Sequence, residues 1–469
     1  MSGRHRFRNE TDVKEENQLW SASRLYKLST QSLDREHDFE DLRIEGVLPT
    51  NLQGTLYRAG PFLYESFGQP YSHPFEADGG IVAARVGGGE AKGATRIVQS
   101  KGLREERAAG SPLYGSAAPW FKRIASAWRQ TVKNTANTSI LSWQGRLFGL
   151  MEAATPTEID PATLETLGDT DLDGVIPQGF SAHPRRCPSR KSIFNLGLSY
   201  GRQNTLDLFG LPEKGPARRV ASVELPYATL VHDFAITDKH AIFLISPAVL
   251  QLWRAILQVG GFADLFRWEP ERGSELIVVP LDATSKARRI QVDAFWVWHF
   301  ANAFEERGDI VFDMCRYKDL NSLDAIGGNE LACPSALVRG RIAENRFTTE
   351  VLTTDLQEFP SASPVMLTKE NRHTWMQGSH GLGRFDHDRG EQDLWNSPDE
   401  QLVSEPVFVP CPNAVHEGEG WVLSLIFDGP ADRSFVGVFD AMNMAEGPRA
   451  KLWFDQRIPL TFHGQFVIS

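Results

Sequence analysis

The stretch from Ile140 to Met151 reads I-L-S-W-Q-G-R-L-F-G-L-M and shows the pattern that decides the fold. It holds two short apolar runs, Ile140–Trp143 and Leu147–Met151, separated by a polar segment that contains a glycine. Apolar runs of about four to eight residues bounded by turn residues are typical of β-strands. We therefore expect each run to form a strand.

The same pattern recurs along the whole chain, in which 40 Gly and 27 Pro are spread evenly rather than gathered into one linker. Further runs of this kind are Ala241–Ile245, Leu276–Val279, Ile310–Phe312, Pro406–Val409 and Trp421–Phe427. Many short strands at this spacing predict an all-β fold, which can be a barrel, a sandwich or a propeller. No repeat of propeller length is evident. A propeller with degenerate repeats therefore remains possible, whereas a long-repeat solenoid is excluded.

Composition narrows the class of protein. Among 469 residues, 49 Lys and Arg stand against 60 Asp and Glu, giving a net charge of −11. An acidic chain is a poor nucleic-acid binder, so we expect no nucleic-acid partner. The four cysteines form no C-x-x-C pair, which favours a reduced compartment. Because residues 1–18 are charged and no long apolar stretch occurs, we expect a cytoplasmic protein without a membrane-spanning helix.

Two segments interrupt the strand pattern. Ala117–Lys133 and Pro247–Trp268 carry apolar and aromatic residues at helical spacing, and Lys122, Arg123 and Arg129 flank the first set. We expect two helices with broad apolar faces. Such a face can pack on the sheet core, or it can contact the surface of a membrane, where aromatic side chains flanked by Lys and Arg are favoured.

Four of the 12 histidines end or adjoin apolar runs: His183, His232, His299 and His463. A titratable ring in such a position is costly to bury unless it binds a metal or forms hydrogen bonds. Imidazole suits Fe, Cu, Zn and Ni alike. From the residues alone, both a metal site and four separately satisfied core histidines remain open.

Other chemical signals are weaker. Glu305 and Glu306 are adjacent carboxylates, and neighbouring residues of a strand point to opposite faces. The chain contains no G-x-S-x-G, no phosphate-binding G-K-[ST] and no H-E-x-x-H motif. These absences leave the histidines as the main candidates for chemistry.

Several motifs in order resemble those of one family. Gly54–Pro61 reads G-T-L-Y-R-A-G-P, Tyr71–Val82 reads Y-S-H-P-F-E-A-D-G-G-I-V, and Met151–Gly168 forms a third block. The four histidines follow in the motifs A-H-P, H-D-F, H-F-A-N-A-F-E-E and T-F-H-G. From about Leu48 to Ser469 the chain resembles the carotenoid cleavage oxygenases.

This resemblance implies a seven-bladed β-propeller with a cap of helices and loops over the iron-containing face. It implies that His183, His232, His299 and His463 bind one Fe(II), that O2 is the co-substrate, and that three glutamates support these ligands. The matching positions are Glu152, Glu358 and Glu417, with Glu419 as a rival for the third. It further implies an N-terminal extension over residues 1–40, partly disordered or packed on the propeller, and a single oxygenase domain over 41–469.

The function implied is cleavage of a conjugated C=C bond in a carotenoid or apocarotenoid to give two carbonyl products. The alternatives are cleavage of a stilbene or other phenylpropanoid, an isomerohydrolase that polarises an ester, and a non-catalytic lipid-binding propeller. Stilbene-cleaving members use a Tyr and a Lys to engage a phenol. The corresponding positions here are Leu103 and Lys133, which weakens that alternative.

The implied substrate, an apolar polyene, is nearly insoluble in water. We therefore expect the enzyme to take it from a bilayer through a peripheral membrane contact. The segments Ala117–Trp128 and Pro247–Phe266 are predicted to lie near one another at the mouth of an apolar tunnel.

Overall fold

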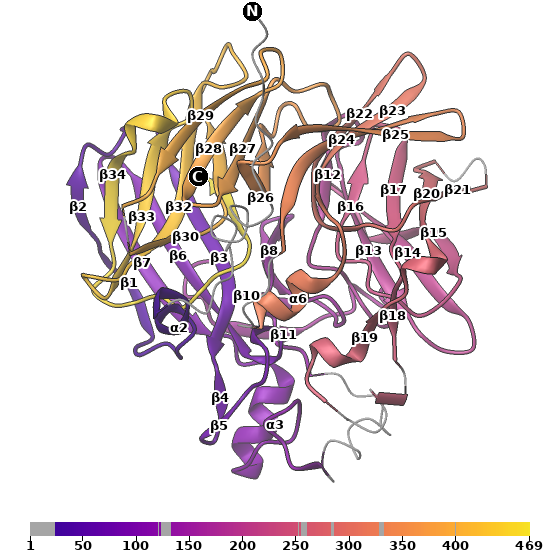
Figure 1. The fold of residues 1–469 in the computed structure, drawn as a ribbon. Helices are drawn as coiled ribbons and strands as arrows, with labels where there is room; N and C mark the ends of the chain where they lie inside the picture. The colour runs from indigo at the N-terminus through magenta and orange to yellow at the C-terminus, as the bar shows by residue number, and fades with distance from the viewer. Residues whose placement is uncertain are drawn as a thin grey trace, which may run out of the picture.

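The computed structural model describes residues 24–120, 122, 133–251, 253–254, 260–282, 286–327, 333–398 and 400–469. Within these residues, seven antiparallel sheets form a β-propeller (Figure 1), which confirms the predicted fold class. Neighbouring sheets stack face to face, so both faces of a middle strand are buried. Ala241–Ile245 is buried at every position, which explains its uninterrupted apolar sequence.

The first three sheets contain the N-terminal strands and the last strand of the chain. The first sheet has β1 (His37–Asp41), β3 (Gly54–Leu63), β6 (Asp78–Gly87), β7 (Glu90–Ile97) and β35 (Gly464–Ile468). The second has β8 (Ser139–Trp143), β9 (Arg146–Leu150), β10 (Thr157–Ile159) and β11 (Thr166–Asp169). The third has β12 (Arg185–Cys187), β13 (Ser192–Ser199), β14 (Asn204–Pro212) and β15 (Arg218–Leu225).

Four more sheets complete the propeller. The fourth has β16 (Phe234–Ile236), β17 (His240–Ile245), β20 (Ser274–Pro280) and β21 (Arg288–Val292). The fifth has β22 (Trp296–Glu306), β23 (Asp309–Tyr317), β24 (Ser335–Ala343) and β25 (Arg346–Thr353). The sixth has β26 (Leu356–Ala362), β27 (His373–Gly378), β28 (Gly381–Asp386) and β29 (Glu391–Asn396). The seventh has β2 (Arg43–Gly46), β30 (Gln401–Val403), β31 (Val407–Pro410), β32 (Gly420–Asp428), β33 (Arg433–Asp440) and β34 (Pro448–Trp453).

Strands from the two ends of the sequence close the ring. The C-terminal β35 pairs with the N-terminal β3, and β2 pairs with β34. Around the axis, inner strands of successive sheets touch: β35 contacts β8, β16 contacts both β12 and β22, and β26 contacts β22 and β31. Since β1 begins at His37, the boundary expected at residue 41 falls inside the first sheet.

Short helices and two small ribbons lie outside the seven sheets. They are α2 (Arg24–Ser29), α3 (Lys101–Ala109), α6 (Asn321–Ile326), the pair β4 (Glu65–Ser66) and β5 (Gln69–Pro70), and the pair β18 (Ala248–Leu250) and β19 (Phe266–Trp268). Single 3₁₀ turns occur at Pro74–Glu76, Pro188–Arg190, Ala263–Leu265, Pro270–Arg272 and Met444–Glu446. Figure 1 shows α3, β4–β5 and β18–β19 together at the lower end of the molecule.

The helix expected over Pro247–Trp268 is wrong at both ends. Ala248–Leu250 and Phe266–Trp268 are paired strands, and the helical residues described between them are Trp253, Arg254 and the 3₁₀ turn Ala263–Leu265. In the segment Ala117–Lys133, Trp120 and Lys122 are helical, while residues 121 and 123–132 lie outside the described residues. No helix in the described part of the chain is long and apolar enough to span a membrane.

Candidate metal centre

The four predicted histidines meet on the propeller axis. His183 and His232 lie two residues before β12 and β16, His463 lies directly before β35, and His299 lies near the start of β22. Four strands from different sheets therefore deliver one ring each to the centre. One nitrogen from each ring lies within 4.8 Å of the others, and all four side chains are buried or nearly so.

Carboxylates fix the tautomer of two rings. His299 Nδ1 pairs with Glu358 Oε2, and His463 Nδ1 lies 2.8 Å from Glu405 Oε1. A carboxylate only accepts hydrogen bonds, so each Nδ1 carries the proton and each Nε2 presents a bare lone pair. These two Nε2 atoms are 3.2 Å apart. Burial also lowers the pKa of His299 well below its usual value, so this ring stays neutral.

Glu152 lies beside the other two rings. Its Oε1 is 3.2 Å from His232 Nδ1 and 3.6 Å from His183 Nε2. Neither Glu152 Oε1 nor His232 Nδ1 has a hydrogen-bond partner among the described residues. His183 Nε2 lies 3.0 Å from His232 Nε2, and burial lowers the pKa of His183 well below its usual value.

This donor set fits a divalent cation. The Nε2 lone pairs of His299 and His463 face one another at 3.2 Å and repel unless a cation lies between them. A metal–imidazole bond of about 2.1 Å places two ligands at a right angle roughly 3.0 Å apart. The three carboxylates offset the charge of such an ion, since four neutral imidazoles supply none. The residues present therefore fit a four-imidazole metal site.

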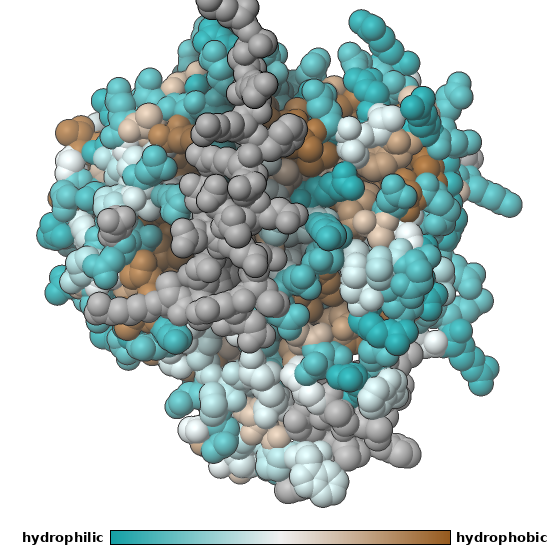
Figure 2. Space-filling model, in the orientation of Figure 1, coloured by the Kyte–Doolittle hydropathy of each residue, from teal (hydrophilic) through white to brown (hydrophobic). Residues whose placement is uncertain are grey.

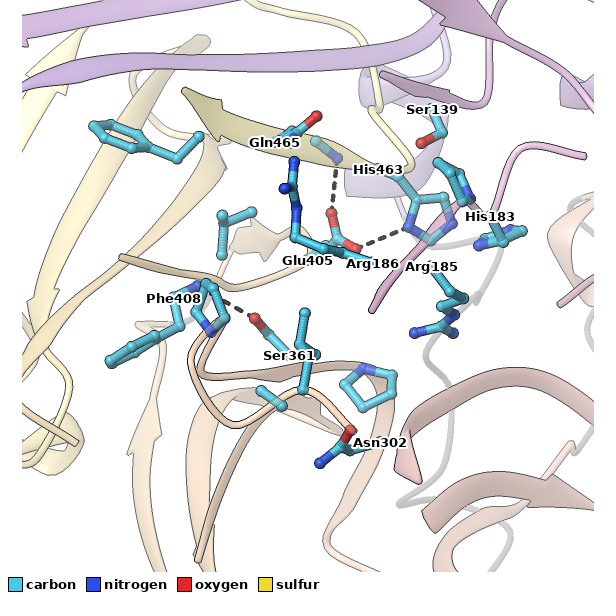
Figure 3. A pocket seen from close by; sticks show the side chains of 18 of the residues that line it. Ser139, His183, Arg185, Arg186, Asn302, Ser361, Glu405, Phe408, His463 and Gln465 are labelled. Atoms are coloured by element: carbon cyan, nitrogen blue, oxygen red, sulfur yellow. Dashed lines mark hydrogen bonds and ion pairs between the residues drawn. The ribbon is translucent and has the colours of Figure 1, made fainter. Parts of the chain in front are cut away.

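The expectation for Glu417 is wrong. Both of its oxygens accept hydrogen bonds from backbone N–H groups, those of Arg372 and His373. Its rival Glu419 accepts a bond from the N–H of Val415. The carboxylate beside His463 is Glu405, which also accepts a bond from the N–H of Gly464 (Figure 3).

The two carboxylates that fix Nδ1 protons are held differently. Glu358 accepts hydrogen bonds from Tyr317 Oη and the N–H of Phe359, and burial raises its pKa to about 7. Burial also tends to raise the pKa of Glu405, but His463 and Arg58 outweigh it and leave this pKa below its usual value. Arg58 is fully buried and lies 3.6 Å from Glu405 Oε2.

Sequence reasoning missed Glu405 and Tyr317. Glu405 comes directly before the predicted strand Pro406–Val409, which the structure shows as β31. The available signal was its position, because Glu405, like the histidines, stands near the start of an inner strand. Tyr317 gave none, because it is the last residue of β23 and reaches Glu358 only through the fold.

An apolar cavity adjoins the histidines on the side of the cap. Its apolar lining consists of Phe75, Trp298, Ile326, Phe359 and Phe462, and its polar lining includes Thr138 and Tyr317. The ring of Trp298 meets that of His232 edge to face, with centroids 4.6 Å apart. Its volume is about 30 Å³, so it has room for a small group beside the histidines, and a longer chain requires the lining side chains to move.

A larger cavity of about 530 Å³, with a mixed polar and apolar lining, also reaches the histidines. His183, His299 and His463 line it together with polar residues such as Arg185 and Gln465 and apolar residues such as Phe300 and Val407. Figure 3 shows the Glu405 carboxylate beside His463 in this cavity. The metal centre therefore lies between a small apolar cavity and a larger mixed one.

Lys133 is occupied by a buried ion network. Its Nζ lies 2.7 Å from Asp78 Oδ2, 2.7 Å from Glu106 Oε2 and 2.9 Å from Tyr71 Oη. An ammonium group has three N–H donors, and all three are used. Leu103, at the other position expected to bind a phenol, is buried in α3. Neither residue is available to a phenol hydroxyl.

Glu305 and Glu306 lie away from the centre and serve different partners. Glu305 pairs with Lys239 and His240, and Glu306 pairs with Arg341. The two carboxylates do not act together, as expected for neighbours on a strand.

Comparisons with known proteins agree with this geometry. The family model described as retinal pigment epithelial membrane protein matches residues 30–468. The apocarotenoid-15,15'-oxygenase of Synechocystis sp. is 32% identical over 93% of this chain and 95% of its own. The isoeugenol monooxygenase of Pseudomonas nitroreducens is 30% identical over 92% of this chain and 95% of its own.

Solved structures show the same fold. Cobalt-substituted Synechocystis apocarotenoid oxygenase superposes with a TM-score of 0.88 at 30% identity, covering 95% of this chain and 98% of that one. The family model, the relatives and the structure all span nearly the whole chain, and the four histidines lie together as the motifs imply. The chain therefore belongs to the carotenoid cleavage oxygenase family, whose members are oxidoreductases that incorporate oxygen from O2.

Proposed function

We propose that this protein is an Fe(II)-dependent dioxygenase that cleaves a conjugated C=C bond of an apocarotenoid or carotenoid. The observation that carries this proposal is the convergence of four imidazole nitrogens within 4.8 Å beside an apolar cavity. In the balanced reaction, the C=C bond and the O–O bond break, and each carbon forms a C=O bond to one oxygen of O2. The products are two carbonyl compounds.

Iron is proposed from the ligands and the relatives together. His183, His232, His299 and His463 would hold the ion, and Glu152, Glu358 and Glu405 would keep the rings oriented. Bound there, a ferrous ion supplies the one-electron chemistry that allows O2 to react with an alkene. The presence of the complete ligand and carboxylate set argues against a non-catalytic lipid-binding propeller.

The residues around the cavity have two tasks. Phe75, Trp298, Phe359 and Phe462 give the space beside the histidines an apolar lining, and these side chains would move apart to admit an apolar chain. Glu358 and Glu405 accept the Nδ1 protons of His299 and His463, which keeps both Nε2 lone pairs directed at the centre.

Lys133 and Leu103 favour a substrate without a phenol. The three N–H donors of Lys133 are satisfied by Asp78, Glu106 and Tyr71, and Leu103 offers none. A phenol hydroxyl would therefore lack the Tyr and Lys that stilbene-cleaving members use. This favours a polyene over a stilbene or other phenylpropanoid.

The experiment that tests the function uses protein loaded anaerobically with Fe(II) and then exposed to ¹⁸O2. The substrate panel contains carotenoids, apocarotenals, a hydroxystilbene and isoeugenol, and products are identified by mass. We expect two carbonyl products from a polyene, each carrying ¹⁸O when trapped before exchange with water. Cleavage of the phenolic compounds alone would overturn the substrate class, and iron-loaded protein that cleaves no member of the panel would overturn the function.

We also propose that the lower end of the molecule contacts a membrane to receive this substrate. Trp120 and Trp253 are 71% and 53% exposed. Their segments approach each other at Ser72, whose N–H donates to Ser116 Oγ and whose side chain lies beside Gly261.

Figure 2 shows side chains of intermediate hydropathy at this end, below a mostly hydrophilic surface. Exposed tryptophans are favoured at the boundary of a bilayer. Phe121, Leu252 and Ile256 of the same two segments lie outside the described residues.

A further inference from the structure

The residues that follow three of the four histidines form one hydrogen-bonded cluster. Arg185 comes two residues after His183, Asp233 comes directly after His232, and Phe300 comes directly after His299. These positions lie at the start of β12, just before β16 and within β22, which belong to three adjacent sheets. The Asp233 side chain is completely buried, and that of Arg185 is 22% exposed.

The Asp233 carboxylate accepts hydrogen bonds from all three strands. Its Oδ1 accepts from the N–H of Phe234 at 2.7 Å and from Arg185 Nε at 3.0 Å. Its Oδ2 accepts from the N–H of Phe300 at 2.8 Å and from the Arg185 Nη2 group. Arg185 Nη2 also donates to the carbonyl of Phe300 at 2.8 Å. A single ion pair therefore ties together the backbones that carry three histidines.

The fourth histidine is held by different groups. The N–H of His463 donates to the carbonyl of Thr138, its carbonyl accepts from the N–H of Ala59, and its ring pairs with Glu405. No contact in the described structure joins His463 directly to the Arg185–Asp233 pair. The cluster can therefore set the relative positions of His183, His232 and His299 as a group.

The geometry of the pair suits this task. A bidentate Arg–carboxylate contact fixes direction as well as distance, and it is strongest where water is excluded. Metal affinity depends on bringing the nitrogens within coordination distance before the ion binds. We propose that Asp233 and Arg185 are positioning residues that hold these three histidines at metal-binding separation. This inference rests on the proposed metal site.

A matched control pair exists in the fifth sheet. Arg339 Nε and Nη2 donate to Asp313 Oδ1 and Oδ2 at 2.8 and 2.9 Å, and the side chains are 22% and 1% exposed. This pair joins β23 to β24 and adjoins none of the four histidines. It has the same bidentate ion pair and nearly the same burial as Arg185–Asp233, without the link to the metal centre.

The test compares Asp233→Asn with Asp313→Asn in the full chain, using Co²⁺ as the probe. Thermal unfolding of the metal-free proteins reports the structural cost, chelator competition gives the Co²⁺ affinity, and visible absorption at saturation reports the ligand geometry. We expect similar losses of thermal stability in the two variants. Only Asp233→Asn should weaken Co²⁺ binding, by about 10–100-fold, and alter the visible bands, because it removes an outer partner of the ligand set.

Equal Co²⁺ affinity and unchanged visible bands in the two variants would overturn the positioning role. If Asp233→Asn does not fold, Arg185→Lys decides, because it keeps the charge and both backbone donors to Asp233 while removing the bidentate contact. This variant should bind Co²⁺ several-fold more weakly, and wild-type affinity would overturn the inference. A different result would show that the proposed metal site itself is wrong. In that case His299→Ala would bind Co²⁺ as tightly as the wild type does.

Discussion

Glu405 shows how one carboxylate can fix the tautomer and orientation of a metal-ligand histidine. Its Oε1 holds the Nδ1 proton of His463, and its Oε2 accepts from the N–H of Gly464, so ring and backbone are fixed together. Arg58 completes this arrangement by donating to Thr461 Oγ1 and to the carbonyls of Glu405 and Phe462. Glu405, two residues before β31, and Arg58 of β3 thus meet beside His463, the last of the four histidines in the chain.

The first prediction concerns this carboxylate. Glu405→Gln should weaken metal binding by about 10–100-fold, because the amide cannot replace the charge that supports the imidazole. The measurement is Fe(II) affinity by anaerobic chelator competition. Glu417→Gln is the control, since Glu417 accepts only from backbone N–H groups near β27. An equal loss in both variants would contradict the assignment.

The second prediction concerns Lys133. Lys133→Met leaves Asp78 and Glu106 buried without a cation, and should lower the free energy of unfolding by about 3–5 kcal/mol. Burial already raises the pKa of Asp78 above its usual value, and losing the ammonium raises it further. The folded variant then takes up a proton as pH falls, which stabilises it relative to the unfolded chain. The loss of unfolding free energy relative to the wild type should therefore be smaller at pH 5 than at pH 8.

Urea unfolding at the two pH values measures this effect. Lys451→Met is the control, because Lys451 pairs with the half-exposed Glu45 on the surface and should contribute less than about 1 kcal/mol. A loss for Lys133→Met that is the same at both pH values would show that the two carboxylates are not the cause.

Strand β6 contains the D-G-G motif, and its glycines have a steric reason. A Cβ at Gly79 would lie 2.3 Å from the carbonyl oxygen of Thr135 and 2.5 Å from that of Ala136. Residues 133–138, which include Lys133, lead to β8 of the second sheet, and β6 passes close to their backbone. The motif therefore joins two sheets, and Asp78 binds Lys133 at the same junction.

The third prediction follows from this close approach. Gly79→Ala should lower the free energy of unfolding by about 1–3 kcal/mol, because backbone atoms must shift to admit the methyl group. Gly87→Ala, at the other end of the same strand, meets no atom within 4 Å and should be nearly neutral. Denaturant unfolding compares the two, and equal effects would contradict the steric account.

The fourth prediction concerns the elements at the lower end. Replacing Trp120 and Trp253 by Ser should lower binding to phospholipid vesicles severalfold, while turnover of detergent-dissolved substrate stays largely unchanged. Sedimentation with vesicles measures binding. The control replaces Leu167 and Val415, which are 60% and 82% exposed. Equal loss of vesicle binding in the two double variants would contradict a specific membrane surface.

Element prediction succeeded where a run had one interpretation. Ile140–Trp143 lies in β8 and Trp421–Phe427 lies in β32, because short apolar runs between turns suit buried strands. Pro247–Trp268 misled, because short apolar segments fit a helix or a strand. There β18 pairs with β19, and Phe266 and Trp268 pack on a cluster that includes Trp296 and Trp298.

At the scale of the molecule, the metal centre depends on every sheet. Within the described residues, four sheets supply the histidines, and the second, sixth and seventh supply Glu152, Glu358 and Glu405. The motifs indicated the four histidines and two of the glutamates. They could not indicate Glu405 or the Arg185–Asp233 pair, because those contacts join residues that only the closed ring brings together.

The fifth prediction is that metal binding stabilises the whole propeller. An ion that binds only the folded state contributes RT ln(1 + [L]/Kd), about 2.7 kcal/mol at a hundredfold excess over Kd. Removing the metal should therefore lower the melting temperature, and adding Fe(II) should restore it. His299→Ala should show little response to Fe(II). A wild-type melting temperature that is independent of metal would contradict the coupling.

The most direct test of the central claim is a crystal structure of the Fe(II)-loaded protein with anomalous data collected at the iron edge. The account predicts one anomalous peak per chain, within bonding distance of the Nε2 atoms of His183, His232, His299 and His463. Glu358 and Glu405 should remain paired with the Nδ1 atoms of His299 and His463. An iron peak elsewhere, or no peak among the four rings in iron-loaded crystals, would contradict it.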